Sequence, residues 1–319
     1  MAEADNTLAG LVQMNDRNLA DIGVTDLLQD TPVLAVLYAV PASEGGTLHK
    51  YTKETVAAGG EFREVNTGVL NAAGQEELVT VTCKYFDGHF HRDVAIAKGF
   101  KDGAAAYMAK QTVKSIRRMM VGIEAQILQG TTLDADGFSG APEYSFVDAL
   151  DEDMVVDAEG AGGASVWLVR STEEDVAIVA GNDGQLNFQF DPEQAPQKII
   201  TDAGTGAGYM AFVADLGGWY AVQFGSRYSI GRIVNLDGTA TLDDDMIADA
   251  ISRFPAGKPP TSIIMNRTQQ KELRESRTTY SPTGQPAPFP SEAFGIPIVI
   301  TDHIKTDEPA MTTTTTTTP

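Results

Sequence analysis

The residues best suited to bind a metal ion lie close together between positions 83 and 93. Cys83, Asp87, His89, His91 and Asp93 all carry ligand atoms, and the His-Phe-His spacing places both imidazoles on one face of an extended strand. Zinc sites usually combine Cys-x-x-Cys pairs or helical His pairs, and this sequence has neither. We therefore interpret these residues as ordinary strand surface and predict neither a metal nor another cofactor.

Two other patterns could support catalysis or phosphate binding. Asp243-Asp244-Asp245 offers neighbouring carboxylates, but these acids begin a predicted helix, whose exposed N–H groups and dipole favour negative charge. The glycine-rich stretch 204–208 faintly resembles a phosphate loop, yet it leads into a strand and no Lys-Ser or Lys-Thr follows. We interpret the acids as a helix cap and the glycines as a turn, and we predict that the chain is not an enzyme.

Composition narrows the class of protein further. A chain of 319 residues with 42% hydrophobic content can bury a sizeable core in two or three domains. Its net charge of -21 repels nucleic acid phosphates except at a local basic patch. The single cysteine excludes an internal disulfide and fits a reducing cytoplasm. The longest apolar run, 32–41, is too short to span a bilayer, so we expect an intracellular product with no membrane partner.

One long helix is predicted from Gly103 to Gln129, about 40 Å in length. Its apolar stripe consists of Met108, Ile116, Met119, Met120, Ile123 and Ile127. On another face, Lys110, Lys114 and Arg117 recur at helical spacing. This basic face is either solvated, paired with acids of a neighbouring subunit, or in contact with DNA. The negative net charge favours protein acids over phosphate as its partner.

Strand patterns precede the long helix. The apolar stretch Pro32–Val40 predicts a buried strand, and Leu48–Thr52 and Glu77–Phe86 predict two more. The polar connection between the last two carries few apolar residues, so together they suggest a long hairpin arm. Such an arm buries little against its own chain, and it needs a partner surface to become ordered.

The second half of the chain is rich in predicted strands. Residues 143–159 are acidic and predict a solvated loop, whereas 166–236 predict one mostly antiparallel module with a turn at Gly217-Gly218. A capping-box-like start at Thr241–Asp244 predicts a helix, and a strand–helix–strand unit follows in which Asn266 caps the helix Arg267–Arg277. Its strands contribute Ile264, Ile298 and Ile300 to the predicted core. Thr312–Thr318 is a low-complexity tract.

Several stretches, taken in order, resemble the major capsid proteins of tailed bacteriophages, whose α+β architecture is called the Johnson fold. The stretches that carry the resemblance are 60–66, the helix end and turn at 122–140, Ser262–Asn266 and Gly295–Asp302. In that family these positions correspond to an extended E-loop hairpin, a spine helix in a peripheral domain, and an axial domain. Some members also have a β-rich inserted segment, which 165–236 resembles.

The resemblance divides the chain into six parts. These are an N-terminal arm with a lead-in strand (1–46), the E-loop hairpin (47–86), a peripheral domain with its spine helix 103–129 (87–140), an acidic loop with the β-rich inserted segment (141–240), the axial strand–helix–strand unit (241–303) and a Thr-rich tail (304–319).

The function implied by the resemblance is structural. The chain would self-assemble through hexamers and pentamers into an icosahedral head shell that encloses double-stranded DNA without sequence-specific binding. Portal, scaffold and decoration proteins are further candidate partners, and the product would be a virion protein assembled in the host cytoplasm. The predicted interface residues are Phe62, Arg63, Glu64 and Asn66 in the hairpin and Lys110, Lys114 and Arg117 on the helix.

Other functions stay open from the sequence. An encapsulin-like shell would share the fold but enclose protein cargo. A small metal-dependent hydrolase using His89, His91 and Asp93 would contain stoichiometric metal. A β-rich adhesin or tail component would form fibres or trimers.

Overall fold

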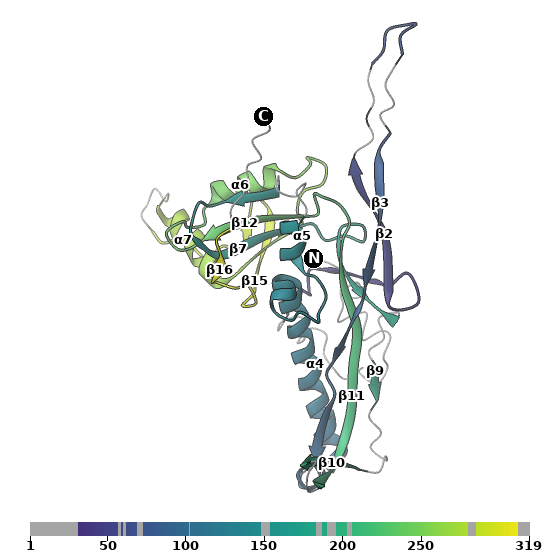
Figure 1. Cartoon of the computed structure of the whole chain (residues 1–319). Coiled ribbons are helices and arrows are strands. Elements are labelled where there is room, and N and C mark those ends of the chain that lie inside the picture. The colour runs from purple at the N-terminus through teal and green to yellow at the C-terminus, as the bar shows by residue number, and fades with distance from the viewer. Residues whose placement is uncertain are drawn as a thin grey trace.

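The computed structural model contains two sheets, one long helix and a thin hairpin that stands away from the rest (Figure 1). It describes residues 31–56, 59, 62–68, 73–101, 103–147, 154–182, 187–189, 196–202, 206–279 and 285–311. Most of the predicted N-terminal arm, part of the acidic loop and the Thr312–Thr318 tract lie outside these residues. Across the described segments, no helix combines the length and apolar character needed to cross a membrane.

The long helix α4 (Gly103–Gln129) has the bounds predicted from the sequence. Its apolar stripe is buried, with Met108, Ile116, Met119, Met120, Ile123 and Ile127 at most 3% exposed. It ends at Gly130, which has a φ of +60 and is followed by the short 3₁₀ turn η3 (Gly130–Thr132). Glycine adopts this left-handed conformation at no steric cost, which explains the stop.

The first sheet is organised around β11 (Ala207–Phe224), a strand of 18 residues that runs beside α4 (Figure 1). Five strands pair with β11 along its length: β4 (Lys84–Asp87), β5 (Phe90–Asp93), β8 (Val176–Ala180), β9 (Asn187–Gln189) and β10 (Gln197–Asp202). β1 (Tyr38–Pro41) extends the sheet by pairing in parallel with β8, and the short helix α3 (Val94–Lys98) follows β5.

The second sheet has the strand order β14-β15-β13-β7-β12-β6, with β16 paired to β7. Its strands are β6 (Val155–Asp157), β7 (Gly162–Val169), β12 (Ile230–Leu236), β13 (Ser262–Met265), β14 (Glu292–Ala293), β15 (Ile296–Ile300) and β16 (Glu308–Pro309). The helices α6 (Asp244–Ser252) and α7 (Arg267–Thr279) belong to the same body, and α5 (Ala141–Val147) lies near the end of α4.

A single hydrophobic cluster joins the two sheets to the C-terminal half of α4. It includes Ile123 of α4, Ile178 and Val222 of the first sheet, and Trp167 and Ile264 of the second. The predicted core residues Ile298 and Ile300 are only partly buried, because β15 directs Ile296 and Val299 inward instead. Since α4 packs against both sheets, a change in its stripe affects the whole body.

The predicted cap at Asn266 is confirmed, whereas the cap of α6 is Asp243, two residues after Thr241, where the predicted capping box begins. The Asp243 carboxylate accepts a hydrogen bond of 2.8 Å from the Met246 N–H at the start of α6. Asn266 Oδ1 accepts from the N–H groups of Thr268 and Gln269 at the start of α7. The acids at 243–245 therefore have a structural role, which is the role that their position at a helix start favours.

The stretch 166–236 is rich in mostly antiparallel strands, as predicted, but it does not form one module. β7 and β12 belong to the second sheet, whereas β8 and β11 belong to the first. The turn predicted at Gly217-Gly218 lies inside β11, and a Cβ at these two positions would collide with the rings of Tyr85 and Tyr220. These glycines therefore allow two aromatic rings to lie close to the backbone, and they do not form a turn.

The buried strand predicted over Pro32–Val40 begins only at Tyr38. The preceding residues form turns, in which Ala35 N–H donates to the Thr31 carbonyl and Leu37 N–H to the Val33 carbonyl. The N–H groups of Val33 and Leu34 donate hydrogen bonds to the Glu124 carboxylate on α4. They are therefore not available to a neighbouring strand.

Candidate subunit interface

The hairpin of β2 (Leu48–Val56) and β3 (Gln75–Thr82) extends away from the rest of the described chain (Figure 1). The two strands pair in antiparallel register from Leu48 opposite Thr82 to Val56 opposite Gln75, and they form a two-stranded sheet of their own. An isolated two-stranded hairpin is at best marginally stable in water. Its length and isolation therefore favour a role in contacting another molecule.

The tip of the hairpin presents apolar side chains on a turn held by its own hydrogen bonds. Thr67 N–H donates to the Glu64 carbonyl, Arg63 donates to the Thr67 carbonyl, and Asn66 has a φ of +72. Phe62 and Val65 on this turn have relative exposures of 109% and 87%. Exposed apolar side chains on an ordered turn are well placed to anchor an interface.

Polar contacts at the base of the hairpin fix its direction. His49 Nε2 lies 2.6 Å from Gln223 Oε1, and the Tyr51 hydroxyl accepts a hydrogen bond from Phe224 N–H. The Lys53 ammonium lies 4.8 Å from the centre of the Tyr144 ring. Burial raises the pKa of Tyr51, so its hydroxyl stays protonated at neutral pH. These contacts join the inner face of β2 to β11 and α5.

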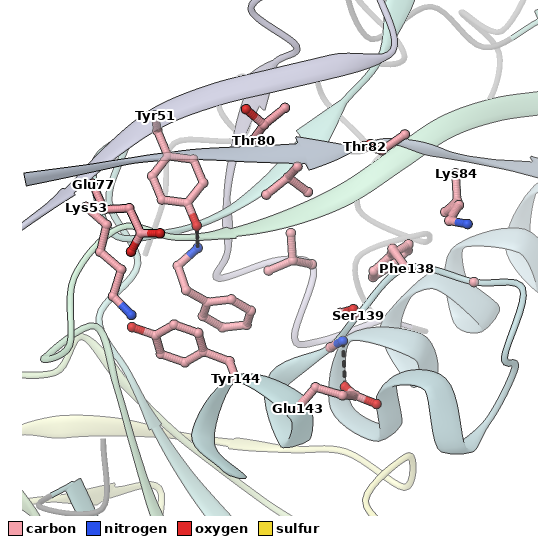
Figure 2. Close-up of a pocket in the computed structure, with 15 residues that line it drawn as sticks. Tyr51, Lys53, Glu77, Thr80, Thr82, Lys84, Phe138, Ser139, Glu143 and Tyr144 are labelled. Atoms are coloured by element: carbon pink, nitrogen blue, oxygen red, sulfur yellow. Dashed lines mark hydrogen bonds between the residues drawn. The ribbon is translucent and has the colours of Figure 1, made fainter. Parts of the chain in front are cut away.

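A groove of about 790 Å³ lies between the hairpin, β11 and α5. Figure 2 shows Tyr51, Lys53 and Glu77 of the hairpin along one side, and Phe138, Glu143 and Tyr144 along the other. Glu143 is held in place because its carboxylate accepts the N–H of Gly140 at 2.8 Å and that of Thr131. The groove combines aromatic surface with charges of both signs, which suits a protein partner more than a small ligand.

The predicted basic face lies on the N-terminal half of α4, far from the hairpin tip (Figure 1). Lys110 and Lys114 are exposed, and Arg117 is half-buried. The structure therefore does not bring the two sets of predicted interface residues together within one chain.

Asp87, His89 and Asp93, three of the candidate metal ligands, make local hydrogen bonds. The Asp87 carboxylate lies 3.1 Å from His89 Nδ1, and the hydrogen bond that it accepts from His89 N–H lowers the pKa of Asp87. Asp93 caps α3 by accepting from Ala95 N–H. Burial raises the pKa of the Cys83 thiol to about 11, which disfavours the thiolate that metals bind. Among the described residues, no three His, Cys, Asp or Glu side chains are grouped as metal ligands.

The sequence analysis missed a set of buried charged groups. Arg170 is paired with Asp175, and Arg232 lies over the Trp167 ring while it donates to Glu308 at 2.7 Å. Glu124 is fully buried on α4. Glu124 directly follows Ile123 in the sequence. A charged residue next to the predicted buried stripe could therefore have indicated a buried acid.

Comparisons with known proteins give one clear result. A family model for the major capsid protein GP7 matches residues 16–312. A search of curated protein sequences found no match. Among solved structures, a chain of bacteriophage Epsilon15 is similar, with a TM-score of 0.57, 18% identity, and coverage of 87% of this chain and 88% of that chain.

Two further similar structures are a bacteriophage capsid and an encapsulin. The capsid of bacteriophage JBD30 has a TM-score of 0.48 and 11% identity, with coverage of 85% of this chain and 89% of that chain. The SrpI encapsulin of Synechococcus elongatus has a TM-score of 0.42 and 8% identity, with coverage of 66% of this chain and 88% of that chain.

The family match spans nearly the whole chain, and the likeness to Epsilon15 supports the α+β capsid fold predicted from the sequence. A shell-forming structural role follows from the family match. This chain belongs to the major capsid protein GP7 family.

Proposed function

We propose that this chain assembles through hexamers and pentamers into an icosahedral phage head that encloses packaged double-stranded DNA. In this proposal the hairpin is the E-loop, α4 is the spine helix of a peripheral domain, and the second sheet with α6 and α7 is the axial domain. The observation that carries the proposal is the exposed apolar tip of a hairpin that stands away from its own subunit.

The hairpin exposes apolar surface that its own subunit does not bury. Beyond the contacts at its base, the hairpin has no further strand paired to it within the described residues. Burying one phenylalanine side chain contributes about 1.5–3 kcal/mol, and the free subunit leaves Phe62 in water. A neighbouring subunit that covers the tip would recover this free energy and would order the arm at the same time.

Repetition of the same contacts would make the shell stable. Each subunit presents the same surfaces, so closed symmetry reuses one set of contacts around every axis. Several modest contacts per subunit multiply through avidity. The net charge of -21 fits a shell that encloses DNA without sequence-specific binding. Portal, scaffold and decoration proteins are proposed as additional partners, with assembly in the bacterial host cytoplasm before incorporation into the virion.

Replacing Phe62 with alanine tests the proposed role of the hairpin tip. We expect the Phe62→Ala subunit to fold normally and to assemble poorly, with the concentration needed for assembly raised about 10- to 100-fold, because each contact loses about 1.5–3 kcal/mol. Circular dichroism measures folding, and sedimentation measures the assembled fraction. Phe62→Tyr, which preserves the ring, should assemble almost normally. An unchanged yield of assembled particles from Phe62→Ala would refute the proposed contact.

Reversing the charges on α4 tests the second proposed contact. Lys110→Glu combined with Lys114→Glu should weaken assembly about three- to tenfold, most strongly at low salt, because exposed ion pairs contribute about 0.2–1 kcal/mol each and are screened by ions. Light scattering across a salt series measures this effect. The double variant Lys258→Glu with Lys271→Glu changes the net charge equally at exposed positions elsewhere. Equal effects from both double variants would mean that general repulsion, not this face, is responsible.

A further inference from the structure

The carboxylate of Glu124 joins three parts of the chain that are far apart in sequence. Its side chain is completely buried on α4. One oxygen, Oε2, accepts hydrogen bonds from Val33 N–H at 3.0 Å and Leu34 N–H at 3.4 Å. The other, Oε1, accepts from the Thr301 hydroxyl at 2.7 Å. One side chain therefore fixes the turn before β1 and the segment after β15 to the long helix.

Few charged groups surround this carboxylate. His303 is the nearest, with Nε2 at 4.0 Å from Oε1. Asp302, in the same segment, is mostly exposed and pairs with Arg267 at 3.0 Å. Residues 31–37 contain no titratable side chain, and one turn away on α4 lie Met120 and Leu128. An ionised Glu124 therefore has no strong cation in contact among the described residues unless His303 is protonated.

We propose that Glu124 is a proton-operated latch, which holds the turn at 31–37 and the segment 301–303 on α4 when protonated and loosens them when ionised. Burial without a neighbouring cation favours the protonated form, because an ionised carboxylate there lacks a compensating charge. The protonated acid still keeps an acceptor oxygen for the N–H groups of Val33 and Leu34. The ionised form keeps its donors but leaves a negative charge in the core, which favours opening toward water.

The direction of the pH dependence follows from the surroundings. Burial raises the pKa of Glu124 to about 7, even though the hydrogen bonds from Thr301, Val33 and Leu34 act in the opposite direction. Burial also lowers the pKa of His303, so that ring is mostly neutral when Glu124 ionises. A raised carboxyl pKa contributes stability that is fully present below the unfolded value of about 4.5 and is lost as pH rises through about 7.

The latch matters because it anchors the turn at 31–37 to the long helix. The proton on Glu124 would decide how firmly this first turn of the described chain is held. The described hydrogen bonds of Glu124 lie within one subunit. The inference therefore goes beyond shell formation and does not depend on it.

Hydrogen exchange measured by mass spectrometry on the purified full chain tests the latch between pH 5.5 and 8.5. After correction for intrinsic exchange rates, we expect the protection of peptides covering 31–37 and 299–305 to fall by up to about tenfold per pH unit as the pH rises toward about 7, because the open state has already released the proton that the closed state keeps. Above about pH 7 both states are ionised, so protection should level off. Glu124→Gln, which keeps the shape and the acceptor without the charge, should abolish this dependence.

Two further variants keep the test decisive. Glu272→Gln removes another buried carboxylate, which accepts from Leu242 N–H, and it should leave the pH dependence at 31–37 unchanged. Thr301→Val removes a donor that stabilises the carboxylate, so it should move the midpoint to higher pH, and it serves if Glu124→Gln folds poorly. A dependence that survives in Glu124→Gln, is absent from the unaltered chain, or does not move in Thr301→Val would overturn the proposal.

Discussion

Replacing Ile123 with aspartate is expected to prevent the chain from folding. Ile123 is completely buried in the cluster where α4 meets both sheets. Loss of its apolar side chain costs about 2–5 kcal/mol, and burying an unpaired carboxylate costs several more. A typical domain is stable by only about 5–15 kcal/mol, so the sum approaches or exceeds the total. Circular dichroism and the soluble yield after expression would measure the loss.

The same substitution at an exposed isoleucine provides the matched control. Ile96 on α3 is 59% exposed, and Ile96→Asp should change the free energy of unfolding by no more than about 0.5 kcal/mol. Ile123→Val, which removes one methylene, should cost about 0.5–1.5 kcal/mol and leave the fold intact. A soluble and cooperatively folding Ile123→Asp protein would show that α4 is not the shared core of the two sheets.

Shortening the hairpin is expected to abolish assembly without unfolding the subunit. Val56 pairs with Gln75, so residues 57–74 can be replaced by Asn-Gly, a two-residue turn that suits an antiparallel hairpin. The contacts of His49, Tyr51 and Lys53 with the body are retained. The shortened chain loses Phe62 and Val65, and with them the proposed contact with the neighbouring subunit.

Thermal unfolding and sedimentation distinguish the possible results for the shortened hairpin. We expect a melting temperature close to that of the complete chain, because none of the described residues among 57–74 belongs to a buried cluster. We also expect no fast-sedimenting particles at concentrations where the complete chain assembles. Normal shells formed by the shortened chain would exclude the hairpin as an intersubunit clamp, whereas a large drop in melting temperature would show that the hairpin stabilises its own subunit.

The long helix was predicted to the residue because its signals are local. The apolar stripe at helical spacing and Gly130 at its end depend on nearby residues alone. The caps at Asp243 and Asn266 were predictable for the same reason. The hairpin strands were found in part. β2 extends four residues beyond the predicted Thr52, to Val56. The predicted strand Glu77–Phe86 is divided into β3, which pairs with β2, and β4, which pairs with β11.

Features that depend on distant residues were not predictable from local patterns. Gly217 and Gly218 lie within β11 because the rings of Tyr85 and Tyr220 occupy the space of a Cβ, and nothing near 217 in sequence indicates Tyr85. The turn at 31–37 depends on Glu124, which is about 90 residues away. The assignment of 166–236 to two sheets depends on pairings with β1 and β13, which lie outside that stretch.

At the candidate interface, too, some features follow from nearby residues and others depend on distant ones. Exposure at Phe62 and at Lys110 follows from the local pattern, and the structure places both on the surface. Which surface of a neighbour receives them depends on contacts between chains, so these residues remain predicted interface residues. The role of Glu124 depends on its contacts with the turn at 31–37 and with the segment after β15, so nearby residues do not indicate it.

Electron microscopy of the purified chain expressed alone, combined with light scattering, tests the central claim most directly. We predict closed shells or flat hexameric sheets, with scattering masses many times that of the 34.0 kDa subunit. Particles of one or two chains at every protein and salt concentration would contradict self-assembly into a shell.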